Sequence, residues 1–161
     1  MTDPARQAAF DALRAVEQRD AFLNLLLPPM LRERGLDART AALATELAHG
    51  TVRWQGAYDA IIDQLAAGRT IEPAVRDVLR LGCHQLLSMR VPDHAAVSTS
   101  VDLVKSAVGH RATGFTNAIL RRVAGHSLDV WLSELTTDLA GDAAVAVRTS
   151  HPEWIVAALR E

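Results

Sequence analysis

Four cationic side chains and one asparagine lie in a stretch of the chain that contains no acid. Between Leu103 and Leu128 there is no Asp or Glu, and the same stretch carries Lys105, Arg111, Asn117, Arg121 and Arg122. Arginine binds phosphate through paired N–H donors and stacks on bases, and an asparagine amide can hydrogen-bond a base edge or a sugar. The stretch therefore indicates RNA contact. It also fits a solvated face whose arginines pair with acids elsewhere, and the residues alone leave both interpretations open.

A helix over residues 113–123 would position three of these side chains. Its apolar residues recur every fourth position and share one face: Phe115, Ile119 and Val123. Asn117 and Arg121 are four apart on the opposite side, with Arg122 on the flank. Because the N-terminus of a helix attracts anions, the start of this helix could also accept a phosphate.

Nearly every other segment also has apolar residues at helical spacing, which predicts a compact all-α bundle of six to eight helices. We expect the apolar run over residues 22–30 to be broken by Pro28-Pro29, and a short helix to follow it. The other expected helices span residues 4–19, 38–66 with a kink near Gly50 or Gly56, 72–90, 97–109, 113–123 and 128–140. The segment 72–90 is apolar over much of its circumference, so it should be central, with Gly82 at a close helix contact.

Composition excludes several classes of protein. With 161 residues and 49% hydrophobic content, the chain is about one globular domain. Cys83 is the only cysteine, which rules out an intramolecular disulfide and a CxxC site, and we expect it to be a packed, unreactive thiol. The chain has no membrane-length apolar run, signal-peptide core, glycine-rich cofactor turn or metal-ligand histidine spacing. We therefore expect a cytoplasmic protein with no catalytic, metal or membrane site in these residues.

Several segments, in a fixed order, resemble a known family. They are ARQAAFDALRAV (5–16), ELAHGTVRW (46–54), LRLGCHQLL (79–87), PDHAAV (92–97) and GFTNAILRRV (114–123). Together they resemble the NusB-like RNA-binding domain, and within that group the N-terminal domain of the RsmB (Sun/Fmu) family. Members of that family use S-adenosylmethionine to methylate carbon 5 of a cytosine in 16S ribosomal RNA. Thr116 departs from the pattern, where we expect a β-branched aliphatic residue on a half-buried face.

The resemblance implies an all-α NusB fold over residues 1–140, with ribosomal RNA as partner. By analogy with NusB, it assigns RNA contacts to Arg6, Asn117, Arg121 and Arg122, whereas Lys105 and Arg111 come from the charge pattern. The string SHPEWI (150–155) is similar to the junction before a catalytic module, so residues 141–161 are expected to be a linker and the start of a truncated methyltransferase module. S-adenosylmethionine and the catalytic cysteines would belong to that module, which is the second expected partner.

Two other functions stay open at this point. The domain could be an interaction module whose face at Asn117 and Arg121 docks on its own catalytic module without touching RNA. It could also be a stand-alone antitermination factor of the NusB type, which the SHPEW segment disfavours. The sequence does not determine the oligomeric state or the target cytosine.

Overall fold

The computed structural model describes residues 2–160, which form ten α-helices, one 3₁₀ turn and no strand. In chain order the elements are α1 (Pro4–Arg19), α2 (Leu23–Glu33), α3 (Ala38–Arg53), α4 (Gln55–Ala66), α5 (Pro73–Leu87), α6 (Asp93–Ala107), η1 (His110–Ala112), α7 (Thr113–Val123), α8 (Leu128–Leu135), α9 (Gly141–Thr149) and α10 (Glu153–Arg160). The expected all-α class is confirmed. The helices exceed the expected six to eight because one predicted helix is divided and α9 is added.

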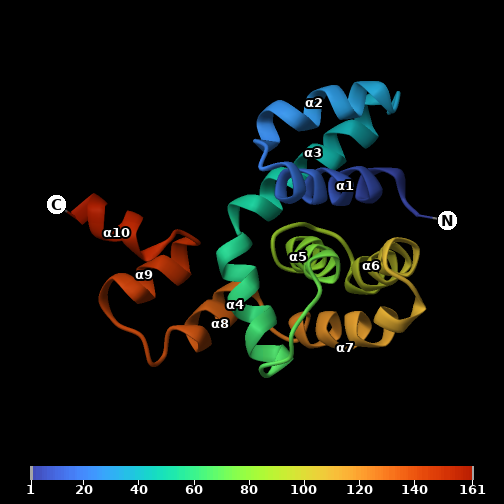
Figure 1. Cartoon of the computed structure of the whole chain (residues 1–161). Coiled ribbons are helices and arrows are strands. Elements are labelled where there is room, and N and C mark those ends of the chain that lie inside the picture. The colour runs from blue at the N-terminus through green and yellow to red at the C-terminus, as the bar shows by residue number, and fades with distance from the viewer. Residues whose placement is uncertain (1, 161) are drawn as a thin grey trace.

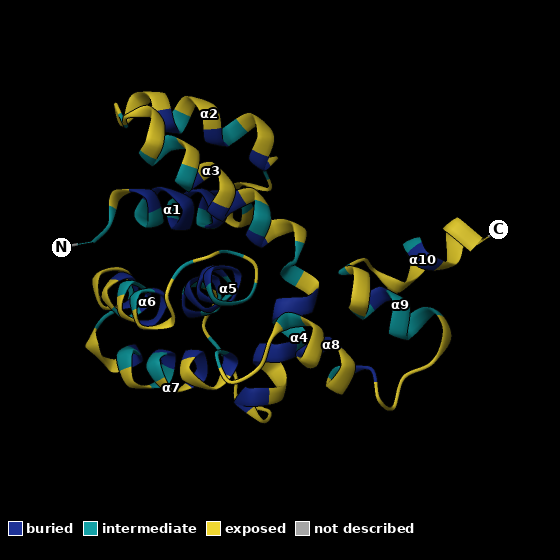
Figure 2. Cartoon of the chain, turned by 180° about the vertical axis from the view of Figure 1, so that it is seen from behind, coloured by how far each residue is buried: buried dark blue, intermediate teal, exposed yellow. Residues whose placement is uncertain are grey.

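Helices α1 to α7 form a bundle around α5. Helix α5 packs against α1, α3, α4, α6 and α7, as Figure 1 shows with α5 viewed along its axis. This confirms the central position expected for the segment 72–90. Helices α8 and α9 pack on α4, and α10 packs on α9, so this C-terminal group lies to one side of the bundle. Figure 2 shows the inward faces of α1 and α5 buried and most of α10 exposed.

Gly82 allows α5 to approach α7 closely. A Cβ at this position would lie 2.7 Å from both terminal methyl carbons of Leu120 and 3.2 Å from Oγ of Ser100. Leu120 is fully buried, so it has little room to move away. The close contact expected at Gly82 is therefore present, and it offsets the low helix propensity of glycine.

The expected break at Pro28-Pro29 is wrong, because α2 continues through both prolines to Glu33. Neither proline has an N–H, so the carbonyls of Asn24 and Leu25 lose their intrahelical donors. All four of these residues are exposed, which leaves the two carbonyls open to solvent. The buried side chains of α2, namely Leu23, Leu27 and Leu31, recur every fourth residue and hold the helix against α1 and α3.

The bend expected near Gly50 or Gly56 is present as a full break at Trp54, two residues before Gly56, which divides the expected helix over residues 38–66 into α3 and α4. Trp54 ends α3 and precedes α4, with φ −99° and ψ 9°. The change of direction lets Tyr58 of α4 reach α5, where its hydroxyl lies 2.8 Å from Nδ1 of His84 and 2.7 Å from Oγ of Ser88. Nε2 of His84 lies 3.1 Å from Oε1 of Glu46, so a polar chain joins α3, α4 and α5.

The expected helix over residues 128–140 ends early, at Leu135. The hydroxyl of Thr136 donates to the carbonyl of Leu132 at 2.7 Å, and that of Thr137 donates to the carbonyl of Ser133 at 3.0 Å. Threonine side chains that bond the backbone in this way compete with continuation of the helix. Helix α9 then forms from residues for which the sequence predicted no helix.

Candidate nucleic-acid interface

Helix α7 carries three of the residues predicted to contact RNA, and its bounds match the prediction. Its buried side chains are Thr116, Ile119, Leu120 and Val123, which face α4, α5 and α6. Phe115 is only half-buried, at the edge of that face. Thr116, expected on a half-buried face, is fully buried, and no partner for its hydroxyl lies within hydrogen-bond distance among the described residues.

The outer arc of α7 presents Asn117, Arg121 and Arg122 in two directions. Because successive residues turn by about 100° along a helix, Arg121 and Arg122 point to different sides. Nε of Arg121 donates to Oδ1 of Asn117 at 3.2 Å, which places these two side chains together. Both arginines are exposed, and neither forms an ion pair with an acid among residues 2–160.

Asn117 and Arg121 line a groove of about 440 Å³ between α7 and α6, together with Asp93, His94, Val97, Ser98, Val101, Asp102 and Ala124. Lys105 follows Val101 by one helical turn, so it extends the same stripe of α6 towards the start of α7. It is exposed and has no acid partner within the described range. The structure therefore brings Asn117 and Arg121 to one groove, and Lys105 lies one helical turn beyond Val101 of its lining.

Arg111 lies on a different side of α7, in an ion pair. Its NH1 and NH2 groups donate to the two carboxylate oxygens of Glu72 at 2.6 and 3.2 Å. This pairing lowers the pKa of Glu72 and raises that of Arg111. Beside the pair, the guanidinium of Arg69 stacks on the ring of Phe115, 4.7 Å from its centroid. These residues line a smaller hollow of about 200 Å³.

Arg69 is a candidate RNA-contact residue that the sequence analysis did not identify. It lies in the connector before α5, where no periodicity indicates which helix the side chain meets. The stack on Phe115 depends on the packing of α4 and α7, which the local sequence does not determine.

Arg6, the sixth predicted residue, makes its contacts within the bundle. Its Nε donates to Oε1 of Gln85 at 2.8 Å, and its NH1 group lies 3.2 Å from Oδ1 of Asp3. Only 11% of the side chain is exposed. In this arrangement Arg6 joins α1 to α5 and offers little surface to a ligand.

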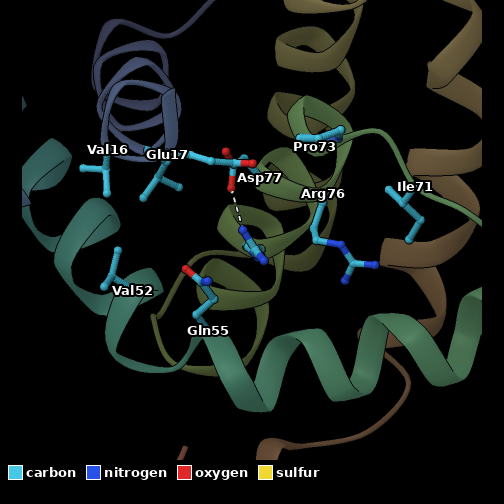
Figure 3. Close-up of a pocket in the computed structure, with 10 residues that line it drawn as sticks. Val16, Glu17, Val52, Gln55, Ile71, Pro73, Arg76 and Asp77 are labelled. Carbon is cyan, nitrogen blue, oxygen red and sulfur yellow. Dashed lines mark hydrogen bonds and ion pairs between the residues drawn. The ribbon is translucent and has the colours of Figure 1, made fainter. Parts of the chain in front are cut away.

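A cavity of about 650 Å³ lies between α1, the α3–α4 junction and α5 (Figure 3). Asp77 is the buried carboxylate at its wall and accepts from Arg14 at 3.0 Å and from Arg80 at 2.9 Å. Arg80 also binds Asp59, through donors 2.8 Å from each carboxylate oxygen. Burial raises the pKa of Asp77, and the two arginines oppose that shift. The arginines are thus satisfied by acids of the bundle, which makes this cluster a link between helices.

Cys83 is completely buried on α5, and burial raises the pKa of its thiol. The expected unreactive thiol fits this position, because the thiolate is the reactive form. Among residues 2–160, no three His, Cys, Asp or Glu side chains gather closely enough to hold a metal ion. None of the helices in that range has both the length and the apolar character needed to cross a membrane.

Comparison with known proteins gives a family match over residues 3–125, to the model of the NusB family. The chain is 45% identical to a putative methyltransferase of Mycobacterium tuberculosis over 99% of its own length and 36% of the relative's. It is 35% identical to ribosomal RNA small subunit methyltransferase B of Pseudomonas putida, over 96% of the chain and 34% of that protein. The chain thus spans about a third of the length of these relatives.

Solved structures show the same fold. The NusB protein of T. maritima superposes with a TM-score of 0.70 at 24% identity, covering 80% of this chain and 95% of that one. A structure of the antitermination factors NusB and NusE in complex with double-stranded RNA gives a TM-score of 0.68 at 26% identity, over 76% of this chain and 95% of the other.

Proposed function

The chain belongs to the NusB family, and we propose that it is the RNA-positioning N-terminal domain of a methyltransferase that modifies carbon 5 of a cytosine in small-subunit ribosomal RNA. The relatives that match almost the whole chain are methyltransferases, and one of them is named for ribosomal RNA. The NusB structures cover a smaller part of the chain, 76–80%. This difference favours a methyltransferase parent over a stand-alone antitermination factor. Ribosomal RNA as substrate places the activity in the cytoplasm.

The observation that carries the proposal is the charge left unpaired on α6 and α7. Seven of the 17 Lys and Arg side chains form ion pairs with acids among the described residues. Lys105, Arg121 and Arg122 are among the ten that form no such pair, and they lie in the stretch 103–128, which contains no acid. Exposed cations without acid partners remain available to phosphates, whose contacts dominate affinity for nucleic acids.

The cofactor expected of such an enzyme is S-adenosylmethionine, which would supply the methyl group. Sites for it on Rossmann-type folds need a glycine-rich turn between a strand and a helix. Residues 2–160 contain no strand, so they do not fit such a site. We therefore assign binding and positioning of RNA to this chain, and we assign no chemical step to its residues.

Charge reversal on α7 tests the proposal. We expect the Arg121→Glu/Arg122→Glu variant to bind a fragment of small-subunit ribosomal RNA more weakly than the unchanged chain. Loss of two phosphate contacts should also make the slope of log affinity against log salt shallower by about 1.4, at about 0.7 per contact for single strands. Fluorescence anisotropy titrations at several salt concentrations measure both quantities.

Arg32→Glu/Arg39→Glu is the matched control, because these arginines are exposed, unpaired with acids of the described chain and located on α2 and α3. This control should retain most of the affinity. Equal loss of RNA affinity in both variants would show that only net charge matters. An α7 variant with unchanged RNA affinity would show that α7 is not part of the interface.

The second candidate function is docking to the rest of a longer protein without RNA contact. Exposed apolar side chains favour it, since Trp154 and Leu159 of α10 are 72% and 81% exposed. Large exposed apolar groups often mark interaction surfaces. If the chain binds no ribosomal RNA fragment at physiological salt, this function replaces the first.

A further inference from the structure

The groove between α6 and α7 has a different charge from the acid-free stretch that forms one of its walls. Its α6 wall contributes the carboxylates of Asp93 and Asp102, and its α7 wall contributes Arg121 as the only Lys or Arg. Both carboxylates are exposed, and neither forms an ion pair with another described residue. Two carboxylates against one guanidinium make the groove itself a poor place for a phosphate, because like charges repel.

The interior of the groove combines an apolar floor with hydrogen-bonding groups. Val97, Val101 and Ala124 supply the apolar surface. Oδ1 of Asn117 accepts from Nε of Arg121, so the amide nitrogen of Asn117 keeps both its hydrogens for another partner. The groove thus presents amide donors on the α7 side and carboxylate acceptors on the α6 side.

A planar ring with both donors and acceptors on its edge matches this arrangement. A carboxylate accepts from the exocyclic amino group of a base, and an asparagine amide can pair with a base edge. The apolar floor would contact the face of the ring. The volume of about 440 Å³ leaves room for a base with part of its sugar. Uracil has no amino group, and its one N–H on the pairing edge lies between two carbonyl oxygens that the carboxylates would repel.

We propose that the α6–α7 groove binds an unpaired base of the RNA, and that Asp93 and Asp102 select bases with an exocyclic amino group over uracil. Lys105, one helical turn beyond Val101, and Arg122 on the outer side of α7 would hold the neighbouring phosphates. The inference rests on the proposed function, because it assigns one nucleotide of the bound RNA to this groove.

Binding of homopolymers tests this specificity on the 161-residue chain. Twelve-nucleotide oligomers of cytidine, adenosine and uridine carry the same phosphate charge, so their affinities differ only through the bases. We expect the cytidine and adenosine oligomers to bind at least about fivefold more tightly than the uridine oligomer, the lower end of the range for one well-made base contact. A blunt RNA duplex, whose bases are paired, should bind no more tightly than the uridine oligomer.

Asp102→Ala should reduce the preference, because loss of the acceptor weakens binding of the cytidine and adenosine oligomers, whereas loss of a repulsive charge slightly strengthens binding of the uridine oligomer. Asp138→Ala is the charge-matched control, an exposed acid beyond α8 and outside the groove. It should raise affinity slightly and leave the preference unchanged. Asn117→Ala should weaken binding of the cytidine and adenosine oligomers more than binding of the uridine oligomer.

Equal affinities for the three oligomers in the unchanged chain would overturn the base site while RNA binding stands. A preference that survives both Asp102→Ala and Asn117→Ala would place base selection outside this groove. If none of the oligomers, the duplex or the ribosomal RNA fragment binds, the proposed function fails, and this inference fails with it.

Discussion

At the scale of single residues, the hydroxyl of Thr116 is one of the buried polar groups that lack a partner among the described residues. The side chain is completely buried on α7, and its Oγ1 has no hydrogen-bond partner among the described residues. Burying a hydroxyl without a partner costs about 1–3 kcal/mol on the basis of mutational data. The aliphatic residue that the family pattern leads us to expect here would fill the same space without that cost.

We therefore predict that Thr116→Val raises the free energy of unfolding by about 1 kcal/mol. Urea denaturation followed by circular dichroism measures the change. Thr136→Val is the control, because the hydroxyl of Thr136 donates to the carbonyl of Leu132 and lies 3.1 Å from NH2 of Arg148. This control should be destabilising. A loss of stability in Thr116→Val would mean that its hydroxyl has a partner in solution.

The residue types of the candidate site could be predicted from the sequence. Which of these side chains are already paired within the protein could not. Arg6 and Arg111 lie in segments where sequence reasoning favoured RNA contact. In the structure their partners are Gln85 and Glu72, which are 79 and 39 residues away along the chain. Pairing over such separations depends on how helices pack, so it could not be inferred from spacing along one helix.

At the scale of helices, the bounds and position of a helix were predicted correctly where its apolar residues share one face and its end residues are typical of helix termini. Helix α7 has the predicted bounds, and α5 has the predicted central position. Prediction failed at α2, where tertiary contacts of Leu27 and Leu31 outweigh two prolines. The bend between α3 and α4 was predicted only approximately, near Gly50 or Gly56, because the contact of Tyr58 with α5 sets the direction of α4.

The close contact between α5 and α7 gives the second stability prediction. Gly82→Ala should lower the free energy of unfolding by about 1–3 kcal/mol, because a Cβ would overlap the buried Leu120. Alanine has the better helix propensity by about 1 kcal/mol, so the expected loss is a net effect of packing. Thermal and urea unfolding measure it.

Gly114→Ala on α7 is the matched control for this change. Nothing lies within 4 Å of the position that its Cβ would occupy, and the residue has a helical backbone. The substitution should stabilise the chain by about 0.4–1 kcal/mol, by restricting the unfolded state. If both alanines stabilise, α5 and α7 can separate slightly without cost, and Gly82 is not needed for their packing.

At the scale of the whole molecule, the chain divides into a bundle and a C-terminal group. The family match ends at residue 125, within the loop between α7 and α8. Helix α9 contacts α4 through few groups, one of which is the hydroxyl of Ser150, the acceptor for the backbone N–H of Ala57 at 3.2 Å. Helix α10 packs chiefly on α9, and Val156 is its one buried residue among those described. We propose that residues 1–140 form the folded unit and that residues 141–161 lead into the methyltransferase module.

A shortened chain tests this division. We predict that residues 1–140 alone unfold in one cooperative transition, because the core around α5 does not include α9 or α10. The free energy of unfolding should fall by about 1–2 kcal/mol, since removal of α9 eliminates a hydrogen bond worth about 1 kcal/mol and exposes part of α4. Urea denaturation followed by both circular dichroism and tryptophan fluorescence tests cooperativity, because Trp54 and Trp131 remain in the shortened chain. Transitions that no longer coincide would show that α9 belongs to the folded unit.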